Sequence, residues 1–202
     1  MEPKAVFDKI QQQFGEEVVF DWHADPKKDK DPWCQVQGWR IEEVCKALRD
    51  DPDTKFEWLE CLTGTDYPDK KQIHVTYHLY SYTHKHRFII KCFLDREDPS
   101  IPTVNFVWST ANWHERETFD LLGVLFEGPP DLRRLLLPDD WEGHPLRKDY
   151  EEKEDYHGIP TIRPNPIELF KITLPSKEAS KEASKEASKE ATKEATKEAT
   201  KE

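Results

Sequence analysis

The chain has 202 residues and a formal net charge of −11 at pH 7, with 36% hydrophobic and 11% aromatic residues. This length and composition can fill the core of one ordinary domain. An acidic surface repels nucleic acid and anionic lipid headgroups, so we expect neither to be a main partner.

The N-terminal part predicts two helices and two short strands. Apolar residues at helical spacing, followed by Gly15, predict a helix over residues 3–14. A short strand is expected over residues 17–22, and residues 33–37 are expected to pair with it. The clearest helical pattern comes next, with apolar side chains at spacing i, i+3, i+4 and i+7: Ile41, Val44, Cys45 and Leu48.

Strands dominate the middle of the chain. Residues 56–62, 73–79 and 88–94 have the alternating or continuous apolar patterns of strands. The last two are expected to form an antiparallel hairpin through residues 81–86. This order of helices and strands indicates an α+β fold, a two-layer sandwich in which a largely antiparallel or mixed sheet carries helices on one face.

Beyond residue 94, frequent prolines exclude long regular elements. The exception is a helix predicted over residues 110–122, with Ser109 or Thr110 as its N-cap and Gly123 at its end. The chain after it is too apolar for a solvated linker, which favours a segment lying along a partner. We therefore predict a core domain over residues 1–123 and an extended, proline-rich docking arm over residues 124–175.

The last predicted element is a low-complexity tail over residues 176–202, which repeats KEAS and then KEAT with seven Lys and seven Glu. Because the tail is neutral, the net charge of −11 belongs to the residues before it. Alanine is its only apolar residue type, so the tail cannot form a core. We expect a disordered or transiently helical spacer.

The cysteines Cys34, Cys45, Cys61 and Cys92 lack CxxC spacing and predict neither a zinc site nor an iron–sulfur cluster. Their apolar surroundings suit buried thiols in a reducing compartment. No segment approaches the roughly 20 apolar residues of a membrane span, and the N-terminus lacks the pattern of a signal peptide. We expect any membrane contact to be indirect.

Residues 115–150 combine opposed charges with prolines and apolar residues. On a helix, Arg116 and Asp120 are i, i+4 neighbours that can pair, whereas Glu115 and Glu117 need donors elsewhere. Two interpretations stay open: an internal salt-bridge network, or docking onto a partner. A catalytic acid and base formed by the two glutamates is disfavoured, because i, i+2 spacing directs them to different sides of a helix.

The run Glu115-Arg116-Glu117, Asp120-Leu121-Leu122, Arg133 and Leu135 resembles the signature of the NADH dehydrogenase 30 kDa subunit family, found in NADH:quinone oxidoreductase, respiratory complex I. Residues 142–150, EGHPLRKDY, resemble the second hallmark of this family. Weaker similarity upstream includes residues 98–103 and 111–113. Pro129 departs from the family, which usually has His or Lys there; proline removes a side-chain donor and stiffens the turn.

The resemblance implies a non-catalytic subunit of the hydrophilic arm, peripheral on the cytoplasmic side of the cell (inner) membrane. It implies contact with the large quinone-site subunit and with other hydrophilic-arm subunits. No cofactor is implied in this chain; FMN, iron–sulfur clusters, NADH and quinone belong to the complex. The resemblance favours docking over an internal network, and the predicted partner-docking residues are Glu115, Arg116, Glu117, Asp120, Arg133, Arg134, His144, Arg147, Lys148 and Asp149.

Two alternative functions remain open. The first is the equivalent subunit of a membrane-bound hydrogenase or of another donor:quinone oxidoreductase. The second is a stand-alone metal hydrolase that binds zinc or nickel through His74, His78, His84 and His86. A polar strand face running into a solvated turn is the preferred interpretation of these histidines, because no carboxylate or cysteine stands at supporting spacing.

Overall fold

The computed structural model of the chain describes residues 2–24, 31–129 and 131–161, and the predicted tail lies outside these ranges. Contacts divide the chain into two compact units, Met1–Glu151 and Glu152–Glu202. This boundary falls within the predicted arm, whose start at residue 124 stays a prediction. The described part of the second unit contains β8 (Asp155–Tyr156) and β9 (Ile159–Pro160), which pair antiparallel.

The first unit contains α-helices, 3-10 helices and strands in mixed order. The helical elements are α1 (Pro3–Phe14), η1 (Gly38–Arg40), α2 (Ile41–Asp50), η2 (Pro68–Lys70) and α3 (Ala111–Leu122). The strands are β1 (Val19–His23), β2 (Trp33–Val36), β3 (Trp58–Tyr67), β4 (Gln72–Ser81), β5 (His86–Asp95), β6 (Ser100–Pro102) and β7 (Leu125–Glu127).

The α-helices lie where the apolar spacing predicts them. Pro3 stands in the first turn of α1, where a backbone N–H has no intrahelical acceptor, so proline costs the helix no hydrogen bond there. The helix ends at Gly15, whose φ of +90° favours glycine. Likewise, α3 ends at Gly123 with a φ of +78°. Of the two predicted N-caps, Ser109 and Thr110, it is Thr110 that stands at the N-cap position, although its side chain makes no capping bond.

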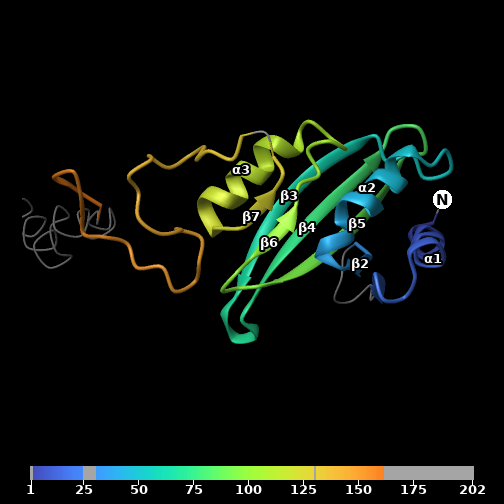
Figure 1. Cartoon of the computed structure of the whole chain (residues 1–202), viewed down its shortest axis with the longest axis horizontal. Coiled ribbons are helices and arrows are strands. Elements are labelled where there is room, and N and C mark those ends of the chain that lie inside the picture. The colour runs from blue at the N-terminus through green and yellow to red at the C-terminus, as the bar shows by residue number, and fades with distance from the viewer. Residues whose placement is uncertain (1, 25–30, 130, 162–202) are drawn as a thin grey trace, which may run out of the picture. The chain divides into compact units, whose positions relative to one another are not determined.

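The main sheet has five strands in the order β1-β2-β5-β4-β3 (Figure 1). β2 and β5 run parallel, and the other neighbouring strands run antiparallel. β4 and β5 stay in unbroken register from Gln72 opposite Asp95 to Ser81 opposite His86, which confirms the predicted hairpin. The α+β class with a largely antiparallel, mixed sheet is therefore confirmed.

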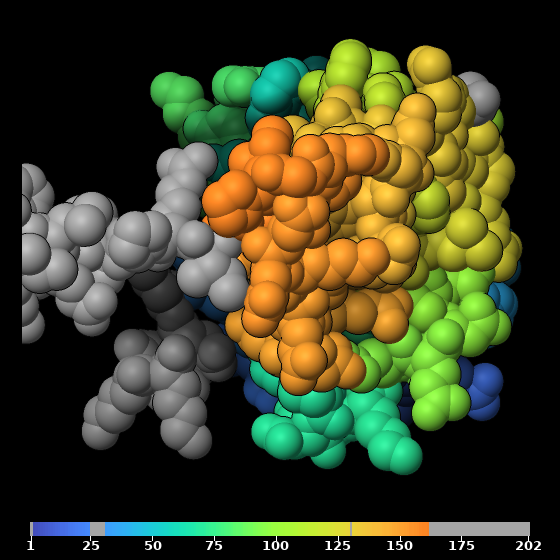
Figure 2. All heavy atoms as spheres, turned by 90° about the vertical axis from the view of Figure 1, so that its left-hand side faces the viewer, coloured from blue at the N-terminus to red at the C-terminus, as the bar shows by residue number. Residues whose placement is uncertain are grey.

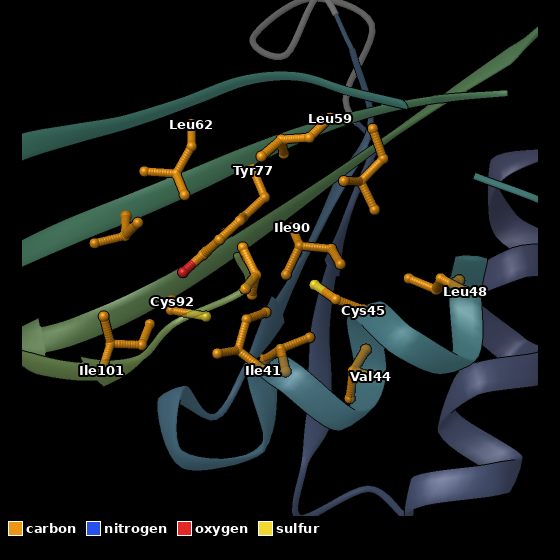
Figure 3. Close-up of a cluster of buried hydrophobic side chains, with 14 of the residues drawn as sticks. Ile41, Val44, Cys45, Leu48, Leu59, Leu62, Tyr77, Ile90, Cys92 and Ile101 are labelled. Atoms are coloured by element: carbon orange, nitrogen blue, oxygen red, sulfur yellow. The ribbon is translucent and has the colours of Figure 1, made fainter. Parts of the chain in front are cut away.

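The core fills the space between α2 and the sheet (Figure 3). The buried face of α2 meets apolar side chains from β3, β4, β5 and β6, including Leu59, Tyr77, Ile90 and Ile101. The four cysteines are free thiols, and three of them are buried in this core. Burial raises the pKa of Cys34, Cys45 and Cys92, which keeps these thiols protonated and unreactive.

α3 packs over β3 at Gly64, where the strand has no room for a side chain. A Cβ at Gly64 would lie 2.4 Å from Cδ1 of Leu122 and 3.0 Å from Cγ2 of Thr118. β3 continues to Tyr67, beyond the predicted end at residue 62. The prediction was short because the polar Thr63 and Thr65 occupy exposed positions and break the apolar pattern.

A short parallel ladder, β6 with β7, joins the chain before α3 to the chain after it. Ile101 and Phe126 are opposite each other in this ladder, and both are buried. The sequence did not predict these strands, because three residues are too few to show an alternating pattern. None of the helices in the described ranges has the length and apolarity needed to cross a bilayer.

We expect Gly64→Ala to destabilise the first unit by about 1–3 kcal/mol, because the added methyl group forces α3 away from β3. The free energy of unfolding in urea measures this effect. Thr63→Val is the matched control, since its side chain is exposed and keeps the β-branched shape. Equal stability of the wild type and the Gly64 variant would show that α3 is not held at this contact.

Candidate docking site on α3 and residues 131–149

The carboxylate of Asp120 organises the chain that follows β7. Its side chain is fully buried in the last turn of α3. Oδ2 accepts hydrogen bonds from three successive backbone N–H groups, those of Leu135, Leu136 and Leu137, at 3.1, 2.8 and 2.8 Å. Oδ1 accepts one from Nη1 of Arg134 at 3.0 Å. We call residues 131–149 the anchored segment.

These donors decide the charge state of Asp120. Burial alone would raise the pKa of this carboxyl, but the N–H groups of residues 137, 136 and 135 and the Arg134 guanidinium outweigh burial. The pKa therefore lies below its ordinary value, and the group stays ionised at neutral pH. A buried carboxylate with this many donors is stable only while the anchored segment stays in place.

Arg116 holds the same segment through its carbonyl groups. Its Nε donates to the carbonyl of Arg133 at 3.0 Å, and its Nη2 donates to that of Arg134 at 3.2 Å. The guanidinium also lies over the ring of Trp113, 5.2 Å from its centroid. The predicted pairing of Arg116 with Asp120 is therefore wrong, because each side chain has better-placed partners in the anchored segment.

The second hallmark motif caps the C-terminal end of α3. Nδ1 of His144 donates to the carbonyl of Asp120 at 3.0 Å, and the N–H of Leu146 donates to that of Leu121 at 3.0 Å. Nε of Arg147 donates to the carbonyl of Leu122 at 2.8 Å. The last carbonyls of a helix have no intrahelical partner, so these donors satisfy three of them. A cation here also suits the negative end of the helix dipole.

Gly123 makes this cap possible. A Cβ at this position would lie 2.5 Å from Nε2 of His144 and 3.0 Å from Nη2 of Arg147. Its left-handed conformation also turns the chain from α3 into β7. The two hallmark motifs, separate in sequence, are thus adjacent parts of one structure in which the second caps the first.

A further anchor lies at the end of β3. Asp66, whose side chain is fully buried, binds Arg96 through two bonds of 2.7 and 3.0 Å. Its Oδ2 also accepts the backbone N–H of Lys148 at 2.9 Å, and Arg96 reaches Asp149 at 2.5 Å. The bond from Arg96 lowers the pKa of Asp66 despite burial. Sequence reasoning missed Asp66 and Arg96, although an acid at a core-facing strand position was a usable signal.

Glu115 faces the core and not the solvent. It is 1% exposed and accepts bonds from the hydroxyl of Thr103 at 2.5 Å and from the N–H of Val104 at 2.8 Å. Burial raises its pKa to about 7, although both bonds favour the charged form. This contact ties the first turns of α3 to the chain that leaves β6.

The other predicted docking residues lie toward solvent. Glu117 and Lys148 are exposed. Arg133 has a side chain that is 77% exposed and pairs with Asp131 at 2.7 Å. Most of the predicted charged groups thus contact their own chain, and partner docking stays a prediction for them all. Figure 2 shows the gold spheres of the anchored segment lying against the yellow-green spheres of α3. The structure does not explain why proline, and not the His or Lys usual in the family, stands at position 129.

The strand histidines do not converge. His74 stacks on Phe93 with ring centroids 3.6 Å apart, and burial lowers its pKa to about 4. His84, in the turn after β4, and His86, the first residue of β5, stack on each other with ring centroids 5.7 Å apart. Within the ranges that the structure describes, no group of three or more His, Cys, Asp or Glu side chains could hold a metal ion.

Comparisons with known proteins agree with the motifs. The family model described as "Respiratory-chain NADH dehydrogenase, 30 Kd subunit" matches residues 34–156. An NADH-quinone oxidoreductase subunit of Chlorobium phaeobacteroides is 42% identical over 161 residues, which cover 77% of this chain and 92% of the relative. The protein of the same name from Chloroherpeton thalassium is 43% identical over 151 residues, which cover 74% of this chain but only 61% of the relative.

Two solved structures resemble this one. A trypsin-resistant fragment of Nqo5 has a TM-score of 0.51 and 26% identity, and the match covers 65% of this chain and all of the fragment. A chain of the membrane-bound sulfane sulfur reductase, described as an archaeal respiratory membrane complex, has a TM-score of 0.59 and 21% identity, covering 73% of this chain and 85% of that chain. The second likeness shows a shared fold.

We expect Asp120→Asn to cost about 3 kcal/mol of the free energy of unfolding, because one acceptor oxygen is lost and Arg134 keeps an uncompensated charge. Amide hydrogen exchange at Leu135, Leu136 and Leu137 should accelerate more than exchange in α2. Asp131→Asn removes a partly exposed carboxylate from the same segment and should change stability much less than Asp120→Asn. Unchanged exchange in the Asp120 variant would contradict the anchoring role.

Glu115 should make stability fall as pH rises. Its folded-state pKa of about 7 lies above the ordinary 4.5, so the folded state binds more protons than the unfolded state between these values. The stabilising contribution of the protonated form is complete below pH 4.5 and is lost as pH rises through 7. Glu115→Gln can make a bond to each partner, because its Oε1 accepts from Val104 and its Nε2 donates to the Thr103 hydroxyl, and its stability relative to the wild type should increase by about 3 kcal/mol from pH 4.5 to 8. Parallel pH profiles of urea unfolding for the two proteins would refute this.

Proposed function

Since the chain belongs to the family of the respiratory-chain NADH dehydrogenase 30 kDa subunit, we propose that it is a non-catalytic subunit of a proton-translocating NADH:quinone oxidoreductase. In this complex, other chains carry FMN and iron–sulfur clusters, which pass electrons from NADH to quinone. The chain binds the large quinone-site subunit and other hydrophilic-arm subunits. Its position is peripheral, on the cytoplasmic side of the cell (inner) membrane.

The observation that carries the proposal is the anchored segment itself. It has no helix or strand between residues 131 and 149, yet its peptide groups are held at Asp120, Arg116 and the carbonyl end of α3. An irregular segment of this length is costly to order. Ordering it on the surface of its own unit produces a fixed shape, which supports a scaffolding role for the chain.

The carboxylates of α3 support a structural role too. Glu115 is buried against Thr103 and Val104, whereas Glu117 is exposed on another side of the helix. Two carboxylates that share no space cannot act as acid and base on one substrate. Docking is therefore proposed for the surface built by α3 and the anchored segment, where Glu117, Arg133, Lys148 and Asp149 are exposed, while the buried Glu115 and Asp120 support this surface from within.

A second candidate keeps the scaffolding role but changes the electron donor. The shared fold with a chain of the sulfane sulfur reductase, an archaeal respiratory membrane complex, supports this alternative. An equivalent subunit of a membrane-bound hydrogenase or of another donor:quinone oxidoreductase is therefore the alternative. Assaying the complex that co-purifies with the tagged chain for quinone reduction by NADH and by hydrogen separates the two.

We expect a tagged full-length chain to recover the large quinone-site subunit and NADH-dependent quinone reductase activity from solubilised membranes. Arg116→Glu and Arg147→Glu should each reduce this recovery, because both reverse a charge that holds backbone carbonyls of the docking surface. Mass spectrometry of the recovered subunits measures the effect. Arg87→Glu is the control, because its side chain is 63% exposed and lies on β5.

Recovery that is unchanged by both substitutions would leave Arg116 and Arg147 as internal scaffolding. Failure of the wild-type chain to recover any oxidoreductase subunit would overturn the proposed function.

A further inference from the structure

Two leucines of the anchored segment combine a fixed backbone with an exposed side chain. The N–H of Leu136 is bound to Asp120 at 2.8 Å, and that of Leu146 is bound to the carbonyl of Leu121 at 3.0 Å. Their side chains are 61% and 54% exposed. Because Asp120 and Leu121 are consecutive residues, one turn of α3 holds both leucines in place.

The buried and half-buried charged groups around these leucines are already engaged. Asp120 is bound by Arg134 and three N–H groups, and Arg147 is bound to the carbonyl of Leu122. At the other end of the segment, Arg96 bridges Asp66 and Asp149. A partner that competed for these charges would have to break buried bonds, which costs more than a surface contact returns. The exposed apolar side chains are the groups left for a partner to bury.

Their fixed position matters for affinity. An apolar side chain on a mobile loop must be ordered during binding, and that cost lowers the affinity. Here the backbone is ordered before any partner arrives. Large apolar side chains on a rigid support, inserted into pockets, are typical of the few residues that dominate binding energy at protein interfaces.

We propose that Leu136 and Leu146 are the anchors by which this chain inserts into an apolar pocket of the large quinone-site subunit. Asp120 is the positioning residue for Leu136, and the carbonyl of Leu121 holds the backbone of Leu146. This inference rests on the proposed function, because it takes the large quinone-site subunit as the occupant.

Charge favours a protein pocket over a lipid surface. The chain carries a net charge of −11, and Asp139, between the two leucines in sequence, is exposed. Anionic headgroups would be repelled by the acidic chain as a whole. An apolar pocket of a protein can accept the leucines without bringing anionic groups close to the acidic chain.

The test compares tagged full-length chains in pull-downs from solubilised membranes. The double variant Leu136→Ala, Leu146→Ala should recover at most about one tenth of the large quinone-site subunit that the wild type recovers. Its unfolding midpoint in urea should stay unchanged, because both side chains are exposed. Retention of the recovered partner at increasing salt is a second readout, and the wild-type interaction should be insensitive to salt.

Tyr82→Ala is the matched control, because Tyr82 is 59% exposed and follows the end of β4. The anchored segment lies at the opposite end of this strand, since Lys148 binds Asp66 and Asp66 is opposite Ile73. The control should recover the large quinone-site subunit as the wild type does. Equal losses in the control and the double variant would overturn the assignment to the leucines.

The outcomes separate the two proposals. Undiminished recovery by the leucine variant would overturn this inference while leaving the family-based function intact. No recovery by the wild type would overturn both. A third arm adds the chains to vesicles of phosphatidylglycerol and phosphatidylethanolamine. Wild-type binding that the leucine variant loses would assign the anchors to a membrane and overturn the protein pocket.

Discussion

The carboxylate of Asp120 is the interaction on which the anchored segment depends. A buried charge without partners is expensive, so Asp120 requires donors, and the segment after β7 requires acceptors for peptide groups that no strand or helix satisfies. Three successive N–H groups and one guanidinium meet on this carboxylate. The carboxylate gains the donors that it needs, and the N–H groups of the segment gain an acceptor. This explains how a segment without regular structure adopts one conformation.

The same logic extends along α3. Arg116 donates hydrogen bonds to carbonyls of the segment. In return, His144, Leu146 and Arg147 of the segment donate to the last carbonyls of the helix. The opposed charges that stood out in the sequence are thus distributed between one helix and one irregular segment. Most of them hold the chain's own backbone, so the exposed side chains are the groups that remain available for contacts with other chains.

Local pattern was enough to predict α1, α2 and α3, because apolar spacing and glycine at the C-terminal end are properties of neighbouring residues. The end of β3 was predicted too early, since Thr63 and Thr65 belong to the exposed face and Asp66 belongs to the core side. The anchors could not be predicted in this way. Asp66 binds Arg96 and Lys148, which are far away in sequence. Arg116 and Asp120 likewise bind residues 133–137 and not each other.

Glu115 and Asp120 show how much of this arrangement depends on the number of donors. Both carboxylates are buried on the same helix, but Glu115 has two donors and a raised pKa, whereas Asp120 has four and a lowered one. The first contact ties α3 to the chain after β6, and the second ties it to the anchored segment. One helix carries both contacts, so α3 is fixed near its first turns by the chain after β6 and in its last turn by the anchored segment.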